Sequence, residues 1–246
     1  MLLSYKKIVS ASSEAKPASN SVDENVKNWW KAKSNDREWL KIDLQKLYVV
    51  NSIQINFADD IEIDCFPDGV DVFAGLHESK RYIDDRIYFT RWLLEGSIDD
   101  KNWFVIADKS NADTDLPHDF IVIENGKRLR YLKLTIIELP YGQNPCISGL
   151  RVFGKDENGE MPSKAENVKI IRTDPLSMDV EWTCKNSTGF EILWGNSPDK
   201  LYHNYRVFGK NKQEIRALVA GAHYFVRIDS FNESGITHGD VIEVKD

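Results

Sequence analysis

Apolar and polar residues alternate in many short segments of the chain, and this period of two predicts β-strands rather than helices. Leu40, Ile42 and Leu44 share one face of the segment 38–44, and the segment 50–57 repeats the pattern. Further segments of this kind, bounded by turn residues, are 92–97, 103–107, 120–123, 130–136 and 147–153. Short strands separated by turns, with no helical period, predict a β-sandwich over residues 1–155.

A second series of predicted strands comes after a polar linker at 156–163, which contains glycine and proline. These strands are 168–172, 178–184, 189–194, 202–208, 214–218, 224–231 and 241–244. Such a series in about 85 residues has the size of an immunoglobulin-like sandwich. Trp182 is its expected core tryptophan, and the spacing of Leu218 and Gly221 before Tyr224 suits a tyrosine corner. The sequence therefore predicts two all-β domains, 1–155 and 164–246.

The least regular part of the chain is residues 58–88. A loop of this length in a compact domain is usually functional or disordered. This segment contains too many aromatic residues for a disordered linker, namely Phe66, Phe73, Tyr82 and Tyr88. We therefore expect a functional loop here.

Composition and charge exclude several classes of function. A hydrophobic content of 41% allows a real core, and an aromatic content of 11% favours β-structure. The net charge of -7, without a long basic patch, argues against nucleic acid or an anionic membrane as the main partner. No apolar run approaches the roughly 18 residues of a membrane span. The N-terminus is no signal peptide, which predicts either a cytosolic protein or part of a longer secreted chain.

No catalytic constellation is recognisable. The chain lacks a Gly-x-Ser-x-Gly elbow, a phosphate-binding loop and a His-Glu-x-x-His motif. The pairs of adjacent aspartates, such as Asp84-Asp85, are typical of solvated turns. The three cysteines are an odd number and predict no disulfide framework. Cys184 is an expected buried small hydrophobe, whereas Cys65 and Cys146 both lie in predicted loops and could form a pair.

Residues 5–154 resemble a discoidin domain, also called coagulation factor 5/8 type C, the fold of carbohydrate-binding module family 32. The segments that carry this resemblance are NSVDEN at 20–25, WW at 29–30, EWLKIDL at 38–44, LEGS at 94–97, NW at 102–103, RYLKL at 130–134 and ISGLRVFG at 147–154. Residues 162–244 resemble a fibronectin type III domain through VEW at 180–182, LVAGAHY at 218–224 and RIDSFNESG at 227–235. The resemblance implies a discoidin-like (galactose-binding-like) β-sandwich followed by an immunoglobulin-like fibronectin type III sandwich.

The pair of domains is similar to the C-terminal region of bacterial glycoside hydrolases resembling family 43, the β-xylosidases and α-arabinofuranosidases. The segments 147–154 and 220–235 carry this similarity. Those enzymes hold their catalytic carboxylates on a five-bladed propeller, which this chain does not contain. The resemblance therefore implies the non-catalytic accessory region of a secreted, extracellular or periplasmic hydrolase. Its implied partners are a polysaccharide or oligosaccharide and a catalytic domain in the same parent chain.

Loops at one end of a sugar-binding sandwich would carry the ligand, with an aromatic ring on the sugar face and polar side chains on its hydroxyls. The candidate residues are Trp29, Phe66, His77, Arg81, Tyr82, Arg86 and Tyr141, with Tyr88, Gln143 and Asn144 beside them. Trp30 is the expected core member of the adjacent tryptophans, and Trp29 the rim member. Two alternatives stay open: a structural spacer that packs on a catalytic domain, and an adhesion module that binds a protein partner.

The resemblance also implies a structural calcium ion in the turn 20–28. Related discoidin modules bind calcium through oxygens at positions that correspond here to Asn20, Asp23, Asn25, Asn28 and Ser148. A glutamate usually stands in those modules where this chain has Gly149, so one charged ligand is missing and the site should be weak. The alternative is an Asx-rich turn whose polar groups are satisfied by its own backbone and by water.

Overall fold

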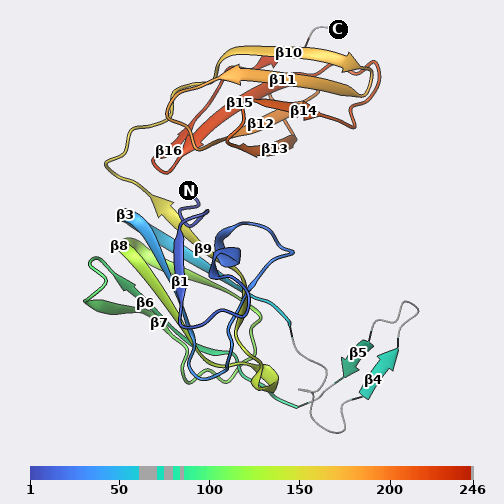
Figure 1. Ribbon diagram of the computed structural model, residues 1–246. Coiled ribbons are helices and arrows are strands. Elements are labelled where there is room, and N and C mark those ends of the chain that lie inside the picture. Colours follow the sequence, from blue (N-terminus) through green and yellow to red (C-terminus); the bar gives the residue numbers. More distant parts are fainter. Residues whose placement is uncertain (61–70, 75–79, 84–85, 245–246) are drawn as a thin grey trace. The chain divides into compact units, whose positions relative to one another are not determined.

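The structure is a computed structural model that describes residues 1–60 and 86–244, together with the backbone of the strands at 71–74 and 80–83 (Figure 1). The chain divides into two compact units, Leu2–Gly154 and Lys155–Asp246. Both units consist of β-strands, and the two helical elements described are short 3-10 turns. Across the described residues, no helix reaches the length and apolarity that crossing a bilayer requires. The predicted all-β fold class is confirmed.

The first unit is built around one long pair of antiparallel strands. Its elements are β1 (Ile8–Ala11), η1 (Ala18–Val22), β2 (Trp30–Lys31), β3 (Trp39–Phe57), β4 (Asp71–Ala74), β5 (Lys80–Ile83), β6 (Arg91–Ser97), β7 (Trp103–Asp108), β8 (His118–Glu138), η3 (Pro140–Gly142) and β9 (Cys146–Lys155). The strands other than β4 and β5 form one sheet in the order β2-β9-β3-β8-β6-β7, and β1 also pairs with β3. β4 and β5 pair only with each other.

β3 and β8 each join two segments that the sequence predicts as separate strands. Their antiparallel pairing continues through register shifts between Asp43 and Tyr48 and between Val50 and Ser52. β1 and β6 pair with the part of this ladder that contains residues 39–43. At the other part, the hydroxyl of Ser148 on β9 donates to the carbonyl of Asn56 on β3 at 3.3 Å. The two halves of the ladder therefore have different neighbours, as in two layers of a sandwich.

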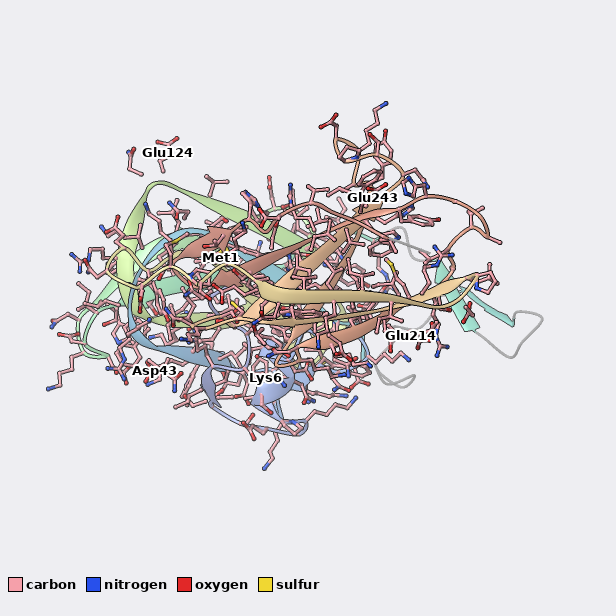
Figure 2. The ribbon with its side chains drawn as sticks, turned by 90° about the horizontal axis from the view of Figure 1, so that it is seen from above. Met1, Lys6, Asp43, Glu124, Glu214 and Glu243 are labelled. Carbon is pink, nitrogen blue, oxygen red and sulfur yellow. The ribbon has the colours of Figure 1, made fainter. Side chains whose placement is uncertain are left out.

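An ion pair holds the corner between these halves. Arg130 donates from Nε and Nη2 to both carboxylate oxygens of Asp43 at 2.7 and 2.8 Å, and Asp43 is labelled in Figure 2. Asp43 also accepts a hydrogen bond from the backbone of Gln45, which has a φ of 74°. The hydrogen bonds from Arg130 hold the pKa of the Asp43 carboxyl below its ordinary value. The carboxylate therefore stays charged at neutral pH and keeps the corner closed.

In most of the predicted strands the buried face is the one that the alternation indicates, whereas in 120–123 Phe120 and Val122 are exposed. Leu40, Ile42, Ile53 and Ile55 are completely buried, as is Trp30. β9 approaches β3 closely at Gly154, where a Cβ atom would lie 2.1 Å from the carbonyl oxygen of Val49. Only glycine leaves room for the backbones at this contact.

The second unit contains two packed sheets. Its strands are β10 (Glu166–Asp174), β11 (Ser177–Thr183), β12 (Gly189–Gly195), β13 (His203–Phe208), β14 (Lys212–Ile215), β15 (Phe225–Asn232), β16 (Gly235–Thr237) and β17 (Ile242–Glu243). One sheet has the order β10-β11-β14, and the other has the order β13-β12-β15-β16 with β17 also on β15. Trp182 lies in the core against Phe190, with ring centroids 5.0 Å apart.

Tyr224 makes the contact that a tyrosine corner requires. Its hydroxyl accepts a hydrogen bond from the backbone N–H of Val219 at 2.9 Å. Cys184 is half-buried against the same core, and its thiol donates to the carbonyl of Ser163 at 3.1 Å. The sequence prediction of a fibronectin type III domain for this unit stays a prediction.

Candidate functional site

Several loops of the first unit meet at one end of its sandwich, and Tyr88 and Tyr141 belong to them. Four hydrogen bonds tie these loops together: Phe57 N to Pro117 O at 3.0 Å, Ala58 N to Cys146 O at 3.0 Å, Thr90 N to Thr114 O at 3.0 Å, and Asn35 Nδ2 to Gly142 O at 2.7 Å. Segments far apart in the sequence therefore form one continuous rim. The antiparallel pairing of β3 with β8 and β9 brings them together.

Two tyrosines from different loops pack against each other on this rim. The rings of Tyr88 and Tyr141 have centroids 4.5 Å apart and are tilted by 38°. Both side chains are half-buried. Tyr141 lies in η3 with φ 60° and ψ 10°, a left-handed conformation that is uncommon for a residue other than glycine. Surrounding structure must hold such a residue in place, and such conformations cluster at binding and active sites.

Polar side chains lie next to Tyr141 in the sequence. Gln143 is buried, and among the described residues its Oε1 has no hydrogen-bond donor. Asn144 is half-buried, and its carbonyl oxygen lies 3.4 Å from the thiol of Cys146. Burial, followed by the charge of Asp60, raises the pKa of the Cys146 thiol to about 12. Cys146 therefore stays a neutral thiol at physiological pH and is no nucleophile.

Cys146 carries a free thiol, and no disulfide. Its side chain is completely buried, at the point where β9 begins. The pairing with Cys65 that the sequence left open is thus not formed by Cys146. Cys65 itself lies outside the described residues.

Trp29 is held by a cluster of charged groups that the sequence did not predict. Its indole Nε1 donates to Asp60 Oδ2 at 2.8 Å, and Lys16 Nζ lies 3.6 Å from the ring centroid. Lys16 and Lys31 also form ion pairs with Asp60, at 2.8 and 3.4 Å. One face and the polar edge of this ring are therefore occupied within the protein.

Asp60 is the centre of this cluster. Burial would raise the pKa of its carboxyl, but hydrogen bonds from Lys16 and Trp29 and the charge of Lys31 outweigh that effect and leave the pKa lowered. The carboxylate is therefore charged at neutral pH and orients the Trp29 ring. No local sequence pattern could reveal this cluster, since Lys16 and Asp60 are 44 residues apart.

The predicted sugar-binding residues are only partly described. Tyr141 packs against Tyr88. Arg86 is exposed and precedes Tyr88 by two residues in the sequence. Trp29 belongs to the Asp60 cluster. Arg81 and Tyr82 lie on β5, where only the backbone is described. Phe66 and His77 lie outside the described residues. The grouping of all seven residues into one site stays a prediction.

The turn predicted to bind calcium is closed by hydrogen bonds of its own. Asp23 Oδ1 accepts from the backbone N–H of Asn25 at 2.8 Å, and Asp23 Oδ2 accepts from Asn28 Nδ2 at 3.0 Å. Asn20 Nδ2 donates to the carbonyl of Trp29 at 3.1 Å, and Ser148 Oγ donates to that of Asn56. Among the described residues, no three acidic, histidine or cysteine side chains gather as they would around a metal ion.

The turn supplies few charged oxygens for a calcium ion, and the oxygens it supplies already accept hydrogen bonds. Asp23 is the single acidic side chain among the five predicted ligands, and both of its oxygens already accept hydrogen bonds. The nearby acid Glu24 forms an ion pair with Arg151 at 2.9 Å. Asn56 occupies the space beside Gly149, where a Cβ atom would lie 2.9 Å from Asn56 Nδ2. An ion would therefore have to replace hydrogen bonds that the turn makes without it.

Comparison with known proteins gives one family match, which covers just under half of the chain. Residues 20–134 match the profile of a factor 5/8 type C family described as a NedA-like, galactose-binding domain. No curated protein sequence matches the chain.

Several solved structures are similar to this chain. One is CpGH89CBM32-6 of Clostridium perfringens, which is 16% identical in sequence and has a TM-score of 0.47. The match covers 63% of this chain and 99% of that chain. Another is the chitosan-binding module 1 of a chitosanase/glucanase from Paenibacillus sp. IK-5, with 17% identity, the same coverage and a TM-score of 0.46. CpGH89CBM32-4 of C. perfringens, in complex with GlcNAc-alpha-1,4-galactose, has 15% identity, 61% and 92% coverage and a TM-score of 0.45.

Proposed function

We propose that the first unit is a carbohydrate-binding module whose sugar site is the loop rim around Tyr141. The match of residues 20–134 to a family described as galactose-binding carries this proposal. The tyrosine pair on the rim supports it, because an aromatic ring can pack against the apolar C–H face of a pyranose. Tyrosine adds a hydroxyl that bonds to the ligand or to water.

The neighbouring side chains supply the polar half of such a site. Asn144 offers a half-buried amide, and Arg86 is exposed close to Tyr88 in the sequence, whereas the amide oxygen of Gln143, unpaired among the described residues, is buried. An amide both donates to and accepts from sugar hydroxyls, and a guanidinium donates to them.

We expect replacement of Tyr141 by alanine to weaken sugar binding by roughly tenfold or more, a loss of about 1.4 kcal/mol. The ring would no longer cover the apolar face of the sugar, and Tyr88 would lose its neighbour. The measurement is affinity electrophoresis of the full chain on galactan, arabinan and xylan, followed by calorimetric titration with oligosaccharides of the polymer that retards it.

Tyr131→Ala is the matched control for this variant. Tyr131 is also half-buried in the first unit, but it faces Asp43 in the ladder, away from the loop rim. This variant should bind as the parent chain does. If no polymer retards the parent chain, or if Tyr141→Ala binds unchanged, the rim is not a sugar site. The structural spacer and the adhesion module are then the functions to test.

We also propose that this chain is the accessory region of a secreted glycoside hydrolase of the β-xylosidase or α-arabinofuranosidase kind, outside the cytoplasm. The similarity of the segments 147–154 and 220–235 to such proteins supports this role. A weak tethered sugar site raises the effective concentration of a catalytic domain near a polymer that repeats the ligand many times. The chain itself would then perform no hydrolysis.

A weak structural calcium ion at the Asp23 turn is a further part of the proposal. We expect about 10 mM calcium to stabilise the parent chain by about 1.4 kcal/mol if the dissociation constant is near 1 mM, because an ion that binds only the folded state shifts the equilibrium by mass action. In Asp23→Ala the effect should disappear. The melting temperature, followed with calcium and with chelator, measures both.

Asp36→Ala is the control for the calcium experiment, because Asp36 is an exposed acid in another loop of the same unit. It should respond to calcium as the parent chain does. A melting temperature that calcium leaves unchanged in the parent chain would instead support the turn closed by its own hydrogen bonds.

A further inference from the structure

The second unit has a hollow at the open side of its sandwich, far along the chain from the loop rim. β13 is the edge strand of one sheet and β14 is the edge strand of the other. A groove of about 450 Å³ lies between them and is lined by Trp194, Tyr205, Gln213, Glu214, Ile215 and Arg216. Glu214 is labelled in Figure 2 and lies on β14. This volume falls within the range of small-molecule sites in proteins.

Two aromatic side chains form the wall on the β12–β13 sheet. Trp194 follows Phe190 and Ile192 on the inward face of β12, and Tyr205 lies directly opposite Ile192 on β13. Cross-strand partners point to the same face of a sheet, so both rings face the groove. His203, the cross-strand partner of Trp194, stacks on its ring with centroids 5.4 Å apart and an angle of 25°. This stacking holds the indole in place.

Several hydrogen-bonding groups of the groove have no partner within the described protein and are available to a ligand. Within the part of the chain that the structure describes, neither the indole N–H of Trp194 nor the hydroxyl of Tyr205 has a hydrogen-bond partner. Gln213 donates through Nε2 to the carbonyl of Glu214 at 2.7 Å, so its Oε1 is still an acceptor. Both donors and acceptors therefore line a groove that also offers aromatic surface.

The charges of the groove cancel. Arg216 Nη2 forms an ion pair with Glu214 Oε2 at 2.7 Å, and no other charged side chain among the described residues lines the groove. A phosphate or carboxylate ligand would have to compete with Glu214 for the guanidinium, so an anion is disfavoured. A neutral ligand that has an apolar face and many hydroxyls matches all three features: aromatic walls, unpartnered donors and acceptors, and no net charge.

We propose that this groove binds a neutral saccharide of one or two sugar units, as a second carbohydrate site independent of the first unit. A ring of the saccharide packs against Tyr205 and the exposed part of Trp194. Its hydroxyls accept from Trp194 Nε1 and donate to Gln213 Oε1. The guanidinium of Arg216 lies at the edge of this groove. With sites on both units, the chain binds a polymer with higher avidity than either site alone provides.

The test uses the full chain with the Tyr141→Ala substitution, which removes the proposed rim site and leaves the groove. The probes are three neutral disaccharides, lactose, xylobiose and N,N′-diacetylchitobiose, each added to about 10 mM, ten times a dissociation constant of 1 mM. The readout is the indole N–H resonance of Trp194 in nitrogen–proton correlation spectra, identified by its loss in Trp194→Phe. We expect at least one probe to shift this resonance in a saturable way.

Two further variants make the result specific. Tyr205→Ala should weaken the response about tenfold, because Tyr205 lines the groove and is half-exposed, so its loss leaves the core intact. Tyr202→Ala should respond as the background chain does, because Tyr202 is exposed on the same unit but does not line the groove.

Two outcomes would overturn the proposal: no shift with any of the three saccharides, or an equal response in Tyr205→Ala. Neither outcome bears on the rim site. Conversely, a saturable shift in the Tyr141→Ala background would establish the groove even if the rim binds no sugar.

Discussion

Replacing Trp30 by alanine should destabilise the first unit by about 3–5 kcal/mol, the usual cost of removing a large aromatic side chain from a core. Trp30 is completely buried, and its indole Nε1 donates to the carbonyl of Ser13 at 3.0 Å. The substitution would leave a cavity and would also remove the donor from the carbonyl of Ser13, which is partly buried. Because β2 pairs through Trp30 with Ile147 of β9, the loss would reach the strand that precedes the linker. Urea unfolding followed by far-ultraviolet circular dichroism measures the change.

The adjacent tryptophan provides the matched control. Trp29→Ala removes a side chain of the same size, but one that is half-buried and bound at the surface by Lys16 and Asp60. Its contacts are one cation–π interaction, worth about 0.5–1 kcal/mol at an exposed site, and one hydrogen bond to a charged group. We expect a loss of about 2 kcal/mol, the lower end of the sum of these two contributions, because both contacts are partly exposed to water. Equal losses for the two variants would mean that the buried and rim positions of the pair are wrongly assigned.

Replacing Asp229 by alanine should destabilise the second unit by about 3 kcal/mol, the lower end of the range for breaking a buried ion pair. The carboxylate is only 4% exposed. It accepts from Arg227 Nε at 2.9 Å and Nη2 at 2.8 Å, and from the backbone N–H of Gly239 at 3.1 Å; its Oδ2 also lies 2.8 Å from His238 Nδ1. The lower end applies because Arg227 is partly exposed, so water can hydrate its guanidinium once Asp229 is gone.

The control is the other histidine–carboxylate pair of this unit. His223 Nε2 and Glu243 Oε1 are 2.9 Å apart, but both side chains are more than half exposed. An exposed pair of this kind contributes about 0–1 kcal/mol, so Glu243→Ala should change the unfolding midpoint little. Calorimetry of the full chain compares the variants. A loss for Asp229→Ala as small as that for Glu243→Ala would show that the buried network does not stabilise the unit.

The long strands β3 and β8 illustrate how far a local pattern predicts structure. Alternation assigns the buried face of both strands because successive side chains of a strand point to opposite sides, whatever the strand pairs with. The same alternation does not show where a strand ends. β3 continues from Trp39 to Phe57 because its ladder with β8 resumes after each register shift, and Gln45, with its positive φ, lies inside the shift between Asp43 and Tyr48.

The segment 58–88 is the opposite case. Its composition predicts an ordered, functional loop, but the antiparallel pairing of Asp71 with Ile83 and of Val72 with Tyr82 cannot be inferred from composition. A short hairpin whose strands pair only with each other leaves little hydrophobic periodicity in the sequence. The cluster at Asp60 is equally hidden, because its members come from three separate segments of the chain.

Side-chain periodicity and turn chemistry, which act over a few residues, were enough to predict the all-β class and the buried faces of the main strands. They also predicted the core positions of Trp30 and Trp182. The packing of Tyr88 on Tyr141, the position of Lys16 over Trp29 and the groove beside Gln213 became visible only in the folded chain. Those contacts join residues that are far apart along the chain or on different strands, and backbone pairing and sheet packing, rather than local pattern, bring them together.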